Sequence, residues 1–273
     1  GLVGSEMCIR DRIGFGIGIN SVISFYMGAQ DKVQADKAAS QGILLATIHG
    51  IVMTAGCIML IKPFLCMFTN DSSIVELGLQ YSYIAFAFST ILAWQLVFEK
   101  TFQAVGRMTA SMTAMLGGCI TNILLDPMLI FGVGIFPDLG IRGAAIATGI
   151  GQTVSLLVYV IIYILRPMPV RFTRKCMKPE KTLCLKMYSV GIPASLNMAL
   201  PSLLISALNV ILAAFSQTYV FVLGVYYKLQ TFLYLPANGV VQGMRPLIGY
   251  NYGAGEHKRV KKIYSTATII VLI

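Results

Sequence analysis

Charged residues are scarce in this sequence, and a soluble fold is the first possibility that their scarcity excludes. Only 12% of the 273 residues are Asp, Glu, Lys or Arg, against roughly 25% in a soluble globular domain. Hydrophobic residues make up 56% and the mean hydropathy is +0.76. We therefore expect an all-α protein, a polytopic bundle of transmembrane helices in contact with the lipid bilayer.

The sequence also lacks the motifs of membrane enzymes. Its two histidines, His49 and His257, form no HExxH motif, and there is no paired aspartate motif and no Ser/His/Asp order. The six cysteines include no CxxC pair, which gives no indication of a disulfide or a metal site. We expect a protein that is not an enzyme and that binds no metal and no cofactor.

Long apolar runs recur along the chain and are separated by short polar stretches. A helix needs about 20 mostly apolar residues to cross roughly 30 Å of hydrocarbon. The sequence predicts seven spans and the beginning of an eighth, at residues 13–28, 41–62, 78–99, 109–134, 143–165, 187–213, 219–249 and from about 263.

The basic residues alternate between loops and predict the orientation of the chain. A net charge of +10 is compatible with nucleic-acid binding, but cytoplasmic loops of multi-pass proteins also carry excess Lys and Arg. Every second loop is basic, with fifteen Lys and Arg against only Lys62 and Arg142 in the others. We expect no nucleic-acid partner, a multi-pass protein of the cell inner (plasma) membrane, and cytoplasmic loops at 166–186 and 250–262.

Two distant segments of the chain are similar to each other. Residues 14–40 align with residues 239–265 at a constant offset of 225, with seven identities; chance in a chain rich in Gly, Ala and Ile is the alternative. Both segments end a predicted span near a Gly-Ala pair and enter a basic loop. They predict a parallel repeat about an axis along the membrane normal, and hence a parent chain of about 450 residues with two like halves.

The expected organisation follows from these patterns. Residues 1–12 differ in character from the rest and are interpreted as a non-native leader. Residues 13–165 are assigned to an N-terminal lobe, 166–186 to a basic inter-lobe linker whose prolines oppose a continuous helix, and 187–273 to the start of a C-terminal lobe. Because the last apolar segment stops part-way, we expect a fragment.

Asp126 is the first candidate functional residue, because ionisable groups within spans are costly and mark functional positions. Asn122 lies four residues before it and so projects from the same helical face. Pro127 removes a backbone donor and frees a carbonyl nearby. This arrangement predicts an H⁺ or Na⁺ site; the alternatives are a kink whose Asp is capped locally and an Asp near the interface.

Two further polar residues belong to the same hypothesis. Glu99 ends the span 78–99 and either points inward as a second acid or pairs with Lys100 or Arg107. Thr148 lies in a run of small residues, 143–152, that permits close helix contact. Its hydroxyl either serves packing or completes the site on the neighbouring helix.

The later spans contain candidate substrate-cavity residues. Lys228, Gln230 and Arg245 share a span that proline and glycine interrupt, which predicts a bent helix that lines a cavity; Arg245 is instead expected to extend to the cytoplasmic face. Asn197 and Asn209 either bond between helices or face the cavity. We assign Lys228, Gln230, Asn197 and Asn209 to the candidate cavity.

Several segments, in their order along the chain, resemble the MATE (multidrug and toxic compound extrusion) antiporter family. The resemblance covers residues 13–273 and is carried by residues 20–29, 103–107, 122–127, 143–148, 191–193 and 246–254. The YYKLQ sequence at residues 226–230 resembles the bacterial multidrug branch.

The resemblance implies two six-helix lobes that alternate between inward-open and outward-open forms. Of these helices this chain holds seven to eight spans, and the first span of the N-terminal lobe is missing. The resemblance also implies a monomeric secondary transporter that exports organic, often cationic compounds in exchange for H⁺ or Na⁺. Asn122, Asp126 and Thr148 match the cation-site positions of the N-terminal lobe, and Glu99 falls near another. A lipid-linked oligosaccharide flippase of related architecture is the alternative, although few basic residues point inward.

Overall fold

The computed structural model describes residues 3–68, 71–132, 134 and 137–272, with the backbone alone at 3–12, 64, 67, 68, 74, 174 and 217. The described residues form helices and no β-strand, which confirms the expected all-α fold. In lipid every backbone N–H and C=O must find a partner within the protein, and a helix provides these partners locally. The contacts divide the chain into two compact units.

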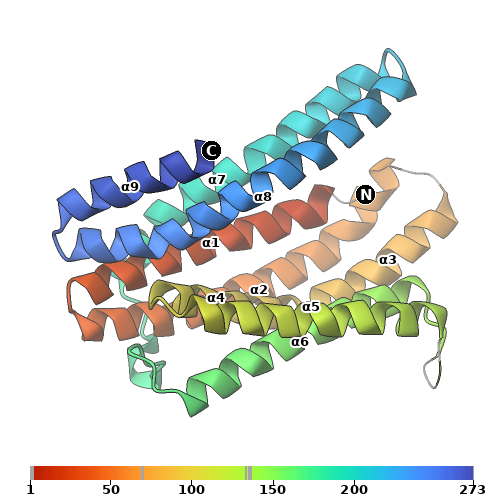
Figure 1. Cartoon of the computed structure of the whole chain (residues 1–273). Coiled ribbons are helices and arrows are strands. Elements are labelled where there is room, and N and C mark those ends of the chain that lie inside the picture. Colours follow the sequence, from red (N-terminus) through yellow and green to blue (C-terminus); the bar gives the residue numbers. More distant parts are fainter. Residues whose placement is uncertain (1–2, 69–70, 133, 135–136, 273) are drawn as a thin grey trace. The chain divides into compact units, whose positions relative to one another are not determined.

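The first unit comprises residues 36–103 and 107–179. Its helices are α2 (Lys32–Phe68), α3 (Ser72–Ala87), α4 (Ser89–Ala104), α5 (Met108–Phe131), α6 (Ile141–Leu165) and the short 3-10 helix η1 (Arg174–Met177). Helices α5 and α6 lie along each other, and α3 also packs against α6 (Figure 1).

Local signals set the helix ends in this unit. The Asp71 side chain accepts a hydrogen bond of 2.9 Å from the Ser73 N–H at the start of α3, which satisfies one of the free donors of a helix N-terminus. Gly132, with φ of 65°, ends α5 in the left-handed conformation that glycine adopts without a steric cost. The short α5–α6 connection follows from that turn.

The segment that follows α6 is fixed to α2 by hydrogen bonds. The Arg171 N–H donates to Asp36 Oδ1 at 2.7 Å, the Thr173 N–H donates to Ser40 Oγ at 3.0 Å, and Gln41 Nε2 donates to the Lys178 carbonyl at 2.8 Å. Val170, in the same segment, is fully buried. Most of the predicted inter-lobe linker is thus an ordered part of the first unit, and α7 begins at Lys181.

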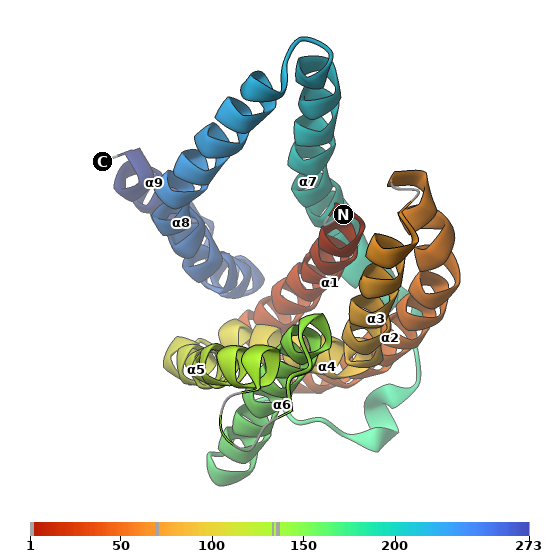
Figure 2. The same ribbon diagram turned by 90° about the vertical axis from the view of Figure 1, so that its right-hand side faces the viewer.

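The second unit comprises residues 2–35, 104–106 and 180–273. It contains α1 (Val3–Gly28), α7 (Lys181–Ala213), α8 (Gln217–Gly253) and α9 (His257–Leu272). Helix α1 packs against both α7 and α8, and these two helices diverge from their connecting turn (Figure 2). Of the predicted leader, Gly1 and Leu2 lie outside the described residues, and the backbone of 3–12 forms the start of α1.

The turns after α1 and α8 have the same hydrogen-bond pattern at the offset of the predicted repeat. After α1, the N–H groups of Ala29, Gln30 and Asp31 donate to the carbonyls of Phe25, Met27 and Tyr26. After α8, those of Ala254, Gly255 and Glu256 donate to Tyr250, Tyr252 and Asn251. Gln30 and Gly255 both have positive φ, 59° and 76°. Both turns thus have the left-handed cap that is common at helix ends, and they occur at the offset of the predicted repeat.

Four helical segments of the described chain are long and apolar enough to cross a membrane: Lys32–Pro63, Met108–Phe131, Ile141–Leu165 and Lys181–Ala213. The segments Val75–Ala87 and Ser89–Ala104, bent by 46°, add a fifth if they are one span. These five correspond to the predicted spans at 41–62, 109–134, 143–165, 187–213 and 78–99. The spans predicted at 13–28, at 219–249 and from 263 are helical and stay predictions as membrane crossings.

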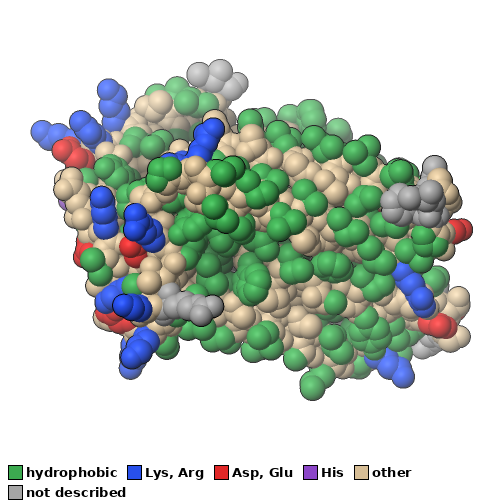
Figure 3. All heavy atoms as spheres, turned by 90° about the horizontal axis from the view of Figure 1, so that it is seen from below, with side chains coloured by type: hydrophobic (Ala, Val, Ile, Leu, Met, Phe, Trp, Pro, Cys, Tyr) green, Lys and Arg blue, Asp and Glu red, His purple; other side chains and the backbone are tan. Residues whose placement is uncertain are grey.

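The surface of the molecule is that of a protein surrounded by lipid. Large apolar side chains such as Ile123, Phe221 and Phe232 are exposed to 62%, 72% and 74%. On the face shown in Figure 3, hydrophobic side chains are spread over much of the surface and charged side chains are few. An aqueous solvent would strongly disfavour such a surface, so the chain is a multi-pass membrane protein.

Candidate functional site

Asn122, Asp126 and Thr148 meet between α5 and α6. Asn122 Nδ2 donates to Asp126 Oδ1 at 3.5 Å and to Thr148 Oγ1 at 3.4 Å. The Thr148 hydroxyl also donates to the Ala144 carbonyl within its own helix at 3.0 Å. We refer to these three residues as the polar triad. Its two longer distances exceed those of a strong hydrogen bond, so the side chains retain freedom to rearrange.

The close approach of α5 and α6 brings Thr148 to the triad. A Cβ atom at Gly151 would lie 2.8 Å from the Gly118 carbonyl oxygen and 3.0 Å from Asn122 Cβ. Likewise, a Cβ atom at Gly143 would overlap the backbone of Leu129. Glycines at both ends of the contact thus allow the helix backbones to approach, as small residues do in membrane helix pairs. The sequence run that predicted packing therefore also positions the Thr148 hydroxyl.

Pro127 lies within α5, which continues as a helix to Phe131. Because proline has no N–H, the Ile123 carbonyl loses its usual helical donor. Asp126 and Asn122 are both half-buried. A carboxylate, a carboxamide, a hydroxyl and a carbonyl without its helical donor therefore lie in one region of the helix pair.

Glu99 lies in a separate, buried cluster on α4. Its Oε1 atom is 2.9 Å from Lys100 Nζ and accepts a hydrogen bond of 3.0 Å from Gln103 Nε2. Glu99, Lys100 and Gln103 are all less than 9% exposed. Of the alternatives for Glu99, pairing with Lys100 is the arrangement observed. Arg107 instead donates from Nη2 to the Pro167 carbonyl at 2.6 Å.

A chain of polar contacts extends from Glu99 toward the helices of the triad. Gln103 Nε2 lies 3.5 Å from Ser111 Oγ on α5, and Ser111 Oγ lies 3.0 Å from the Tyr159 hydroxyl on α6. No described hydrogen bond joins Glu99 directly to Asp126. The structure thus brings together three of the four predicted cation-site residues and connects the fourth to the same helix pair.

The four predicted cavity residues do not line the pocket found in the second unit. Lys228 and Asn197 are exposed, and Gln230 and Asn209 are half-buried. The pocket has a volume of about 540 Å³ and lies between α1, α7 and α8. Whether Lys228, Gln230, Asn197 and Asn209 face substrate stays a prediction.

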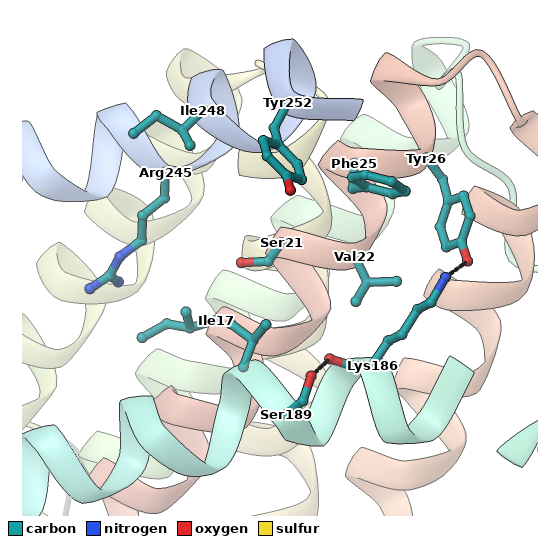
Figure 4. A pocket seen from close by; sticks show the side chains of 12 residues that line it. Ile17, Ser21, Val22, Phe25, Tyr26, Lys186, Ser189, Arg245, Ile248 and Tyr252 are labelled. Carbon is teal, nitrogen blue, oxygen red and sulfur yellow. Dashed lines mark hydrogen bonds between the residues drawn. The ribbon is translucent and has the colours of Figure 1, made fainter. Parts of the chain in front are cut away.

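The pocket brings together residues that sequence analysis did not combine. Lys186 comes from α7, Arg245 from α8, and Ser21, Phe25 and Tyr26 from α1 (Figure 4). Lys186 Nζ donates to the Tyr26 hydroxyl at 2.8 Å and lies 6.0 Å from the centre of the Phe25 ring. In the sequence, Lys186 was one basic residue of a loop and Tyr26 ended a span, and no local pattern related them.

Comparison with known proteins gives a consistent result across the chain. The MatE family model matches residues 12–128 and 193–273. The Staphylococcus haemolyticus "Multidrug export protein MepA" is 27% identical over 238 residues, which cover 87% of this chain and 52% of that protein. The protein of the same name from Staphylococcus aureus is 26% identical over 262 residues, or 95% and 57% of the two chains.

A solved structure has the same fold. It is described as the "Outward-facing conformation of a multidrug resistance MATE family transporter of the MOP superfamily". The TM-score is 0.89 at 26% identity, and the match covers 97% of this chain and 58% of the other. The chain spans about half the length of the curated relatives that it matches. Because the family model covers most of the sequence and the helices superpose throughout, the chain belongs to the MatE family.

Proposed function

We propose that this chain is part of a secondary transporter that exports organic, often cationic drugs across the plasma membrane in exchange for H⁺ or Na⁺. The relatives named as multidrug export proteins support the export of drugs. The match to the MatE family and to multidrug export proteins supports a transporter that is not an enzyme. The polar triad in the first unit supports the coupling to a cation, and it is the observation that carries the proposal.

Coupling follows from the chemistry of Asp126. An ionised carboxylate only accepts hydrogen bonds, which matches the donation from Asn122 Nδ2 to Asp126 Oδ1. A protonated carboxyl group keeps an acceptor oxygen and gains an O–H donor, so the bond from Asn122 Nδ2 is no longer charge-assisted and the amide can turn to offer its oxygen instead. Such a turn would also disturb the contact between Asn122 and Thr148 on α6. Protonation at one residue thereby changes the packing of two helices.

Na⁺ would act on the same groups. The Asp126 carboxylate, the Asn122 amide oxygen and the Thr148 hydroxyl supply oxygen ligands, and the ion would replace the donated hydrogen bond of Asn122. Either cation shifts the equilibrium between two conformations only to the extent that its affinity for them differs. The loosely bonded triad is suited to this, because a bound cation would replace its long hydrogen bonds with shorter contacts to oxygen.

Glu99 has a supporting part in the proposal. Its pairing with Lys100 keeps it bonded while buried, and the path through Gln103, Ser111 and Tyr159 connects α4 to α5 and α6. A rearrangement at the triad would thus be transmitted to α4. The drug would bind in a cavity lined by side chains of α7 and α8. We assign four residues of these helices to that cavity: Lys228, Gln230, Asn197 and Asn209.

Replacement of Asp126 by Asn tests the coupling site. The protein is expressed from its complete reading frame in cells that lack their own drug exporters, and efflux of preloaded ethidium is followed by fluorescence. We expect Asp126→Asn to lower the rate by at least about tenfold, as loss of a group that the transport cycle requires. The membrane content of the protein should remain unchanged.

Asp138→Asn is the matched control. Asp138 lies on the exposed α5–α6 connection, where Oδ1 accepts a bond from the Gly140 N–H at 3.2 Å, and its replacement should leave efflux near the wild-type rate. Gly151→Val is a second variant, because a larger side chain separates Thr148 from Asn122 while all three residues of the triad remain. Undiminished ethidium export by Asp126→Asn would contradict the coupling site. Absence of export by the wild type would contradict the substrate class.

A further inference from the structure

The pocket of the second unit carries two positive charges and no negative one. The side chains of Lys186 and Arg245 line it, and no Asp or Glu is among its lining residues. Figure 4 shows Lys186 beside Tyr26 on one side and Arg245 on the other, with Ser21 and Tyr252 between them. An organic cation would be repelled here, whereas an anion would be attracted from two sides.

Arg245 has a guanidinium group that is available to bind a ligand. Its guanidinium group is half-buried, and it makes no hydrogen bond or ion pair with any described residue. A guanidinium group has five N–H donors in a fork that fits the oxygens of a phosphate. Lys186, with its amine already directed by Tyr26, supplies a second positive charge.

The rest of the pocket is apolar. Ile17, Val22, Val190 and Ile248 form much of its wall, together with the Phe25 ring. A free inorganic anion would make no use of this wall, because apolar surface attracts only apolar groups. A volume of about 540 Å³ is within the range of sites for organic ligands. The expected ligand is therefore an amphiphile with an anionic head and hydrocarbon chains.

The position along the chain agrees with this chemistry. Lys186 ends the basic stretch 166–186, Tyr26 precedes the loop after α1, and Tyr252 lies in the stretch 250–262. The charge pattern predicts that these loops face the cytoplasm. Anionic phospholipid headgroups are concentrated at that surface and attract nearby Lys and Arg.

We infer that the pocket between α1, α7 and α8 is a binding site for an anionic phospholipid. The anionic headgroup lies among the polar side chains that line the pocket, Arg245, Lys186, Ser21 and Tyr252, and the acyl chains lie against Ile17, Val22 and Ile248. The inference is independent of the proposed coupling site, which lies in the other unit. It requires only the charges and the apolar wall described above.

Lipid binding is tested with the purified full protein in detergent. Native mass spectrometry counts bound lipid while phosphatidylglycerol and phosphatidylcholine with the same acyl chains are titrated. We expect the wild type to bind phosphatidylglycerol about tenfold more tightly than phosphatidylcholine, which corresponds to one strong charge-assisted contact. Lys186→Gln and Arg245→Gln should each reduce this preference several-fold, and the double variant should abolish it.

The control variants separate the pocket from general surface charge. Lys181→Gln on α7 and Arg259→Gln on α9 remove the same charges from exposed positions outside the pocket, and both should retain the preference for phosphatidylglycerol. Arg245→Lys keeps the positive charge and should retain most of the preference for phosphatidylglycerol. Ile248→Trp fills the apolar side of the pocket without removing a charge, and should lower the affinity for both lipids. This variant tests the site independently of whether Arg245→Gln folds.

The outcomes are distinct. Loss of the preference in the Lys186 and Arg245 variants, with the controls unchanged, supports the site. An equal affinity of the wild type for the two lipids overturns the proposal, as does an equal loss in the Lys181 and Arg259 controls. Inorganic phosphate is titrated in a parallel arm, and displacement of phosphatidylglycerol by low-millimolar phosphate also overturns it, because the site would then be one for a free anion.

Discussion

Gly28 and Gly253 occupy equivalent positions on opposite sides of one helix crossing. A methyl group at Gly28 would overlap the carbonyl oxygen of Tyr250, and one at Gly253 would overlap that of Phe25. The two contacts are related by the repeat offset of 225 residues, since Phe25 corresponds to Tyr250. Such reciprocity is what a local two-fold relation between α1 and α8 requires. It agrees with the parallel repeat that the sequence predicts.

The first prediction concerns this crossing. Gly28→Ala and Gly253→Ala should each lower the free energy of unfolding by about 1–3 kcal/mol, because the added methyl meets a backbone carbonyl that has little freedom to move. Unfolding of the purified protein in mixed micelles, followed by tryptophan or thiol-reactive fluorescence, measures the change.

The repeat supplies the control for these variants. No neighbouring atom of the described residues lies within 4 Å of a Cβ at Gly239 or Gly243. Gly239→Ala and Gly243→Ala should therefore be neutral or stabilise the protein by up to about 1 kcal/mol, through helix propensity. Equal effects at all four glycines would show that the crossing is not close.

The second prediction concerns the turn after α1. Gln30 adopts φ of 59°, and its counterpart in the other turn is Gly255, with φ of 76°. A side chain in the left-handed region has a steric cost that glycine avoids, so Gln30→Gly should stabilise the protein by about 0.5–1 kcal/mol and Gly255→Gln should destabilise it by a similar amount.

Thermal midpoints of the two variants and of the double exchange provide the measurement. Because the two turns are separate, the double exchange should lie close to the wild type. Ala29→Gly is the control, since Ala29 does not have positive φ, and it should not stabilise. A lower midpoint for Gln30→Gly would mean that the turn in solution differs from the one described.

The third prediction concerns the buried ion pair of Glu99 and Lys100. Lys100→Met leaves the Glu99 carboxylate buried without its cation, and should destabilise the protein by about 3–5 kcal/mol. Glu99→Gln combined with Lys100→Met removes both charges and should recover a large part of this loss, because no unpaired charge then remains.

A double-mutant cycle of unfolding free energies measures the coupling between the two side chains. Glu76→Gln is the control: Glu76 is exposed on α3 and accepts one long bond from Gln80, so its replacement should change stability by less than about 0.5 kcal/mol. Additive effects of the Glu99 and Lys100 substitutions would contradict the buried pair.

The features that depend on local sequence patterns were predicted more completely than those that depend on tertiary contacts. Five of the predicted membrane spans correspond to helices long and apolar enough to cross a membrane, if the bent pair is one span, and the pairing of Asn122 with Asp126 follows from their helical spacing. MatE family membership is confirmed by the family model and by solved structures. Each of these depends on residues that are close together in the sequence, or on the order of motifs along it.

Features that depend on tertiary contacts were harder to predict. Spacing left open whether Glu99 points inward as a second acid or pairs with Lys100 or Arg107, because the choice depends on side-chain conformation within a packed helix bundle. Lys186 and Tyr26 are 160 residues apart, and their contact requires α1 to pack against α7. The pocket residues were missed because no sequence pattern indicated that packing.

The bonds that hold residues 171–178 against α2 also determine how α7 is connected to the rest of the chain. Gln41 fixes the backbone as far as Lys178, and α7 begins at Lys181. Only Pro179 and Glu180 lie between, and the boundary of the two compact units falls between them. Because the Pro179 ring fixes its φ, few backbone torsions are free to rotate. The path from the contacts with α2 to the first turn of α7 is therefore short, and a proline ring sets one of its backbone torsions.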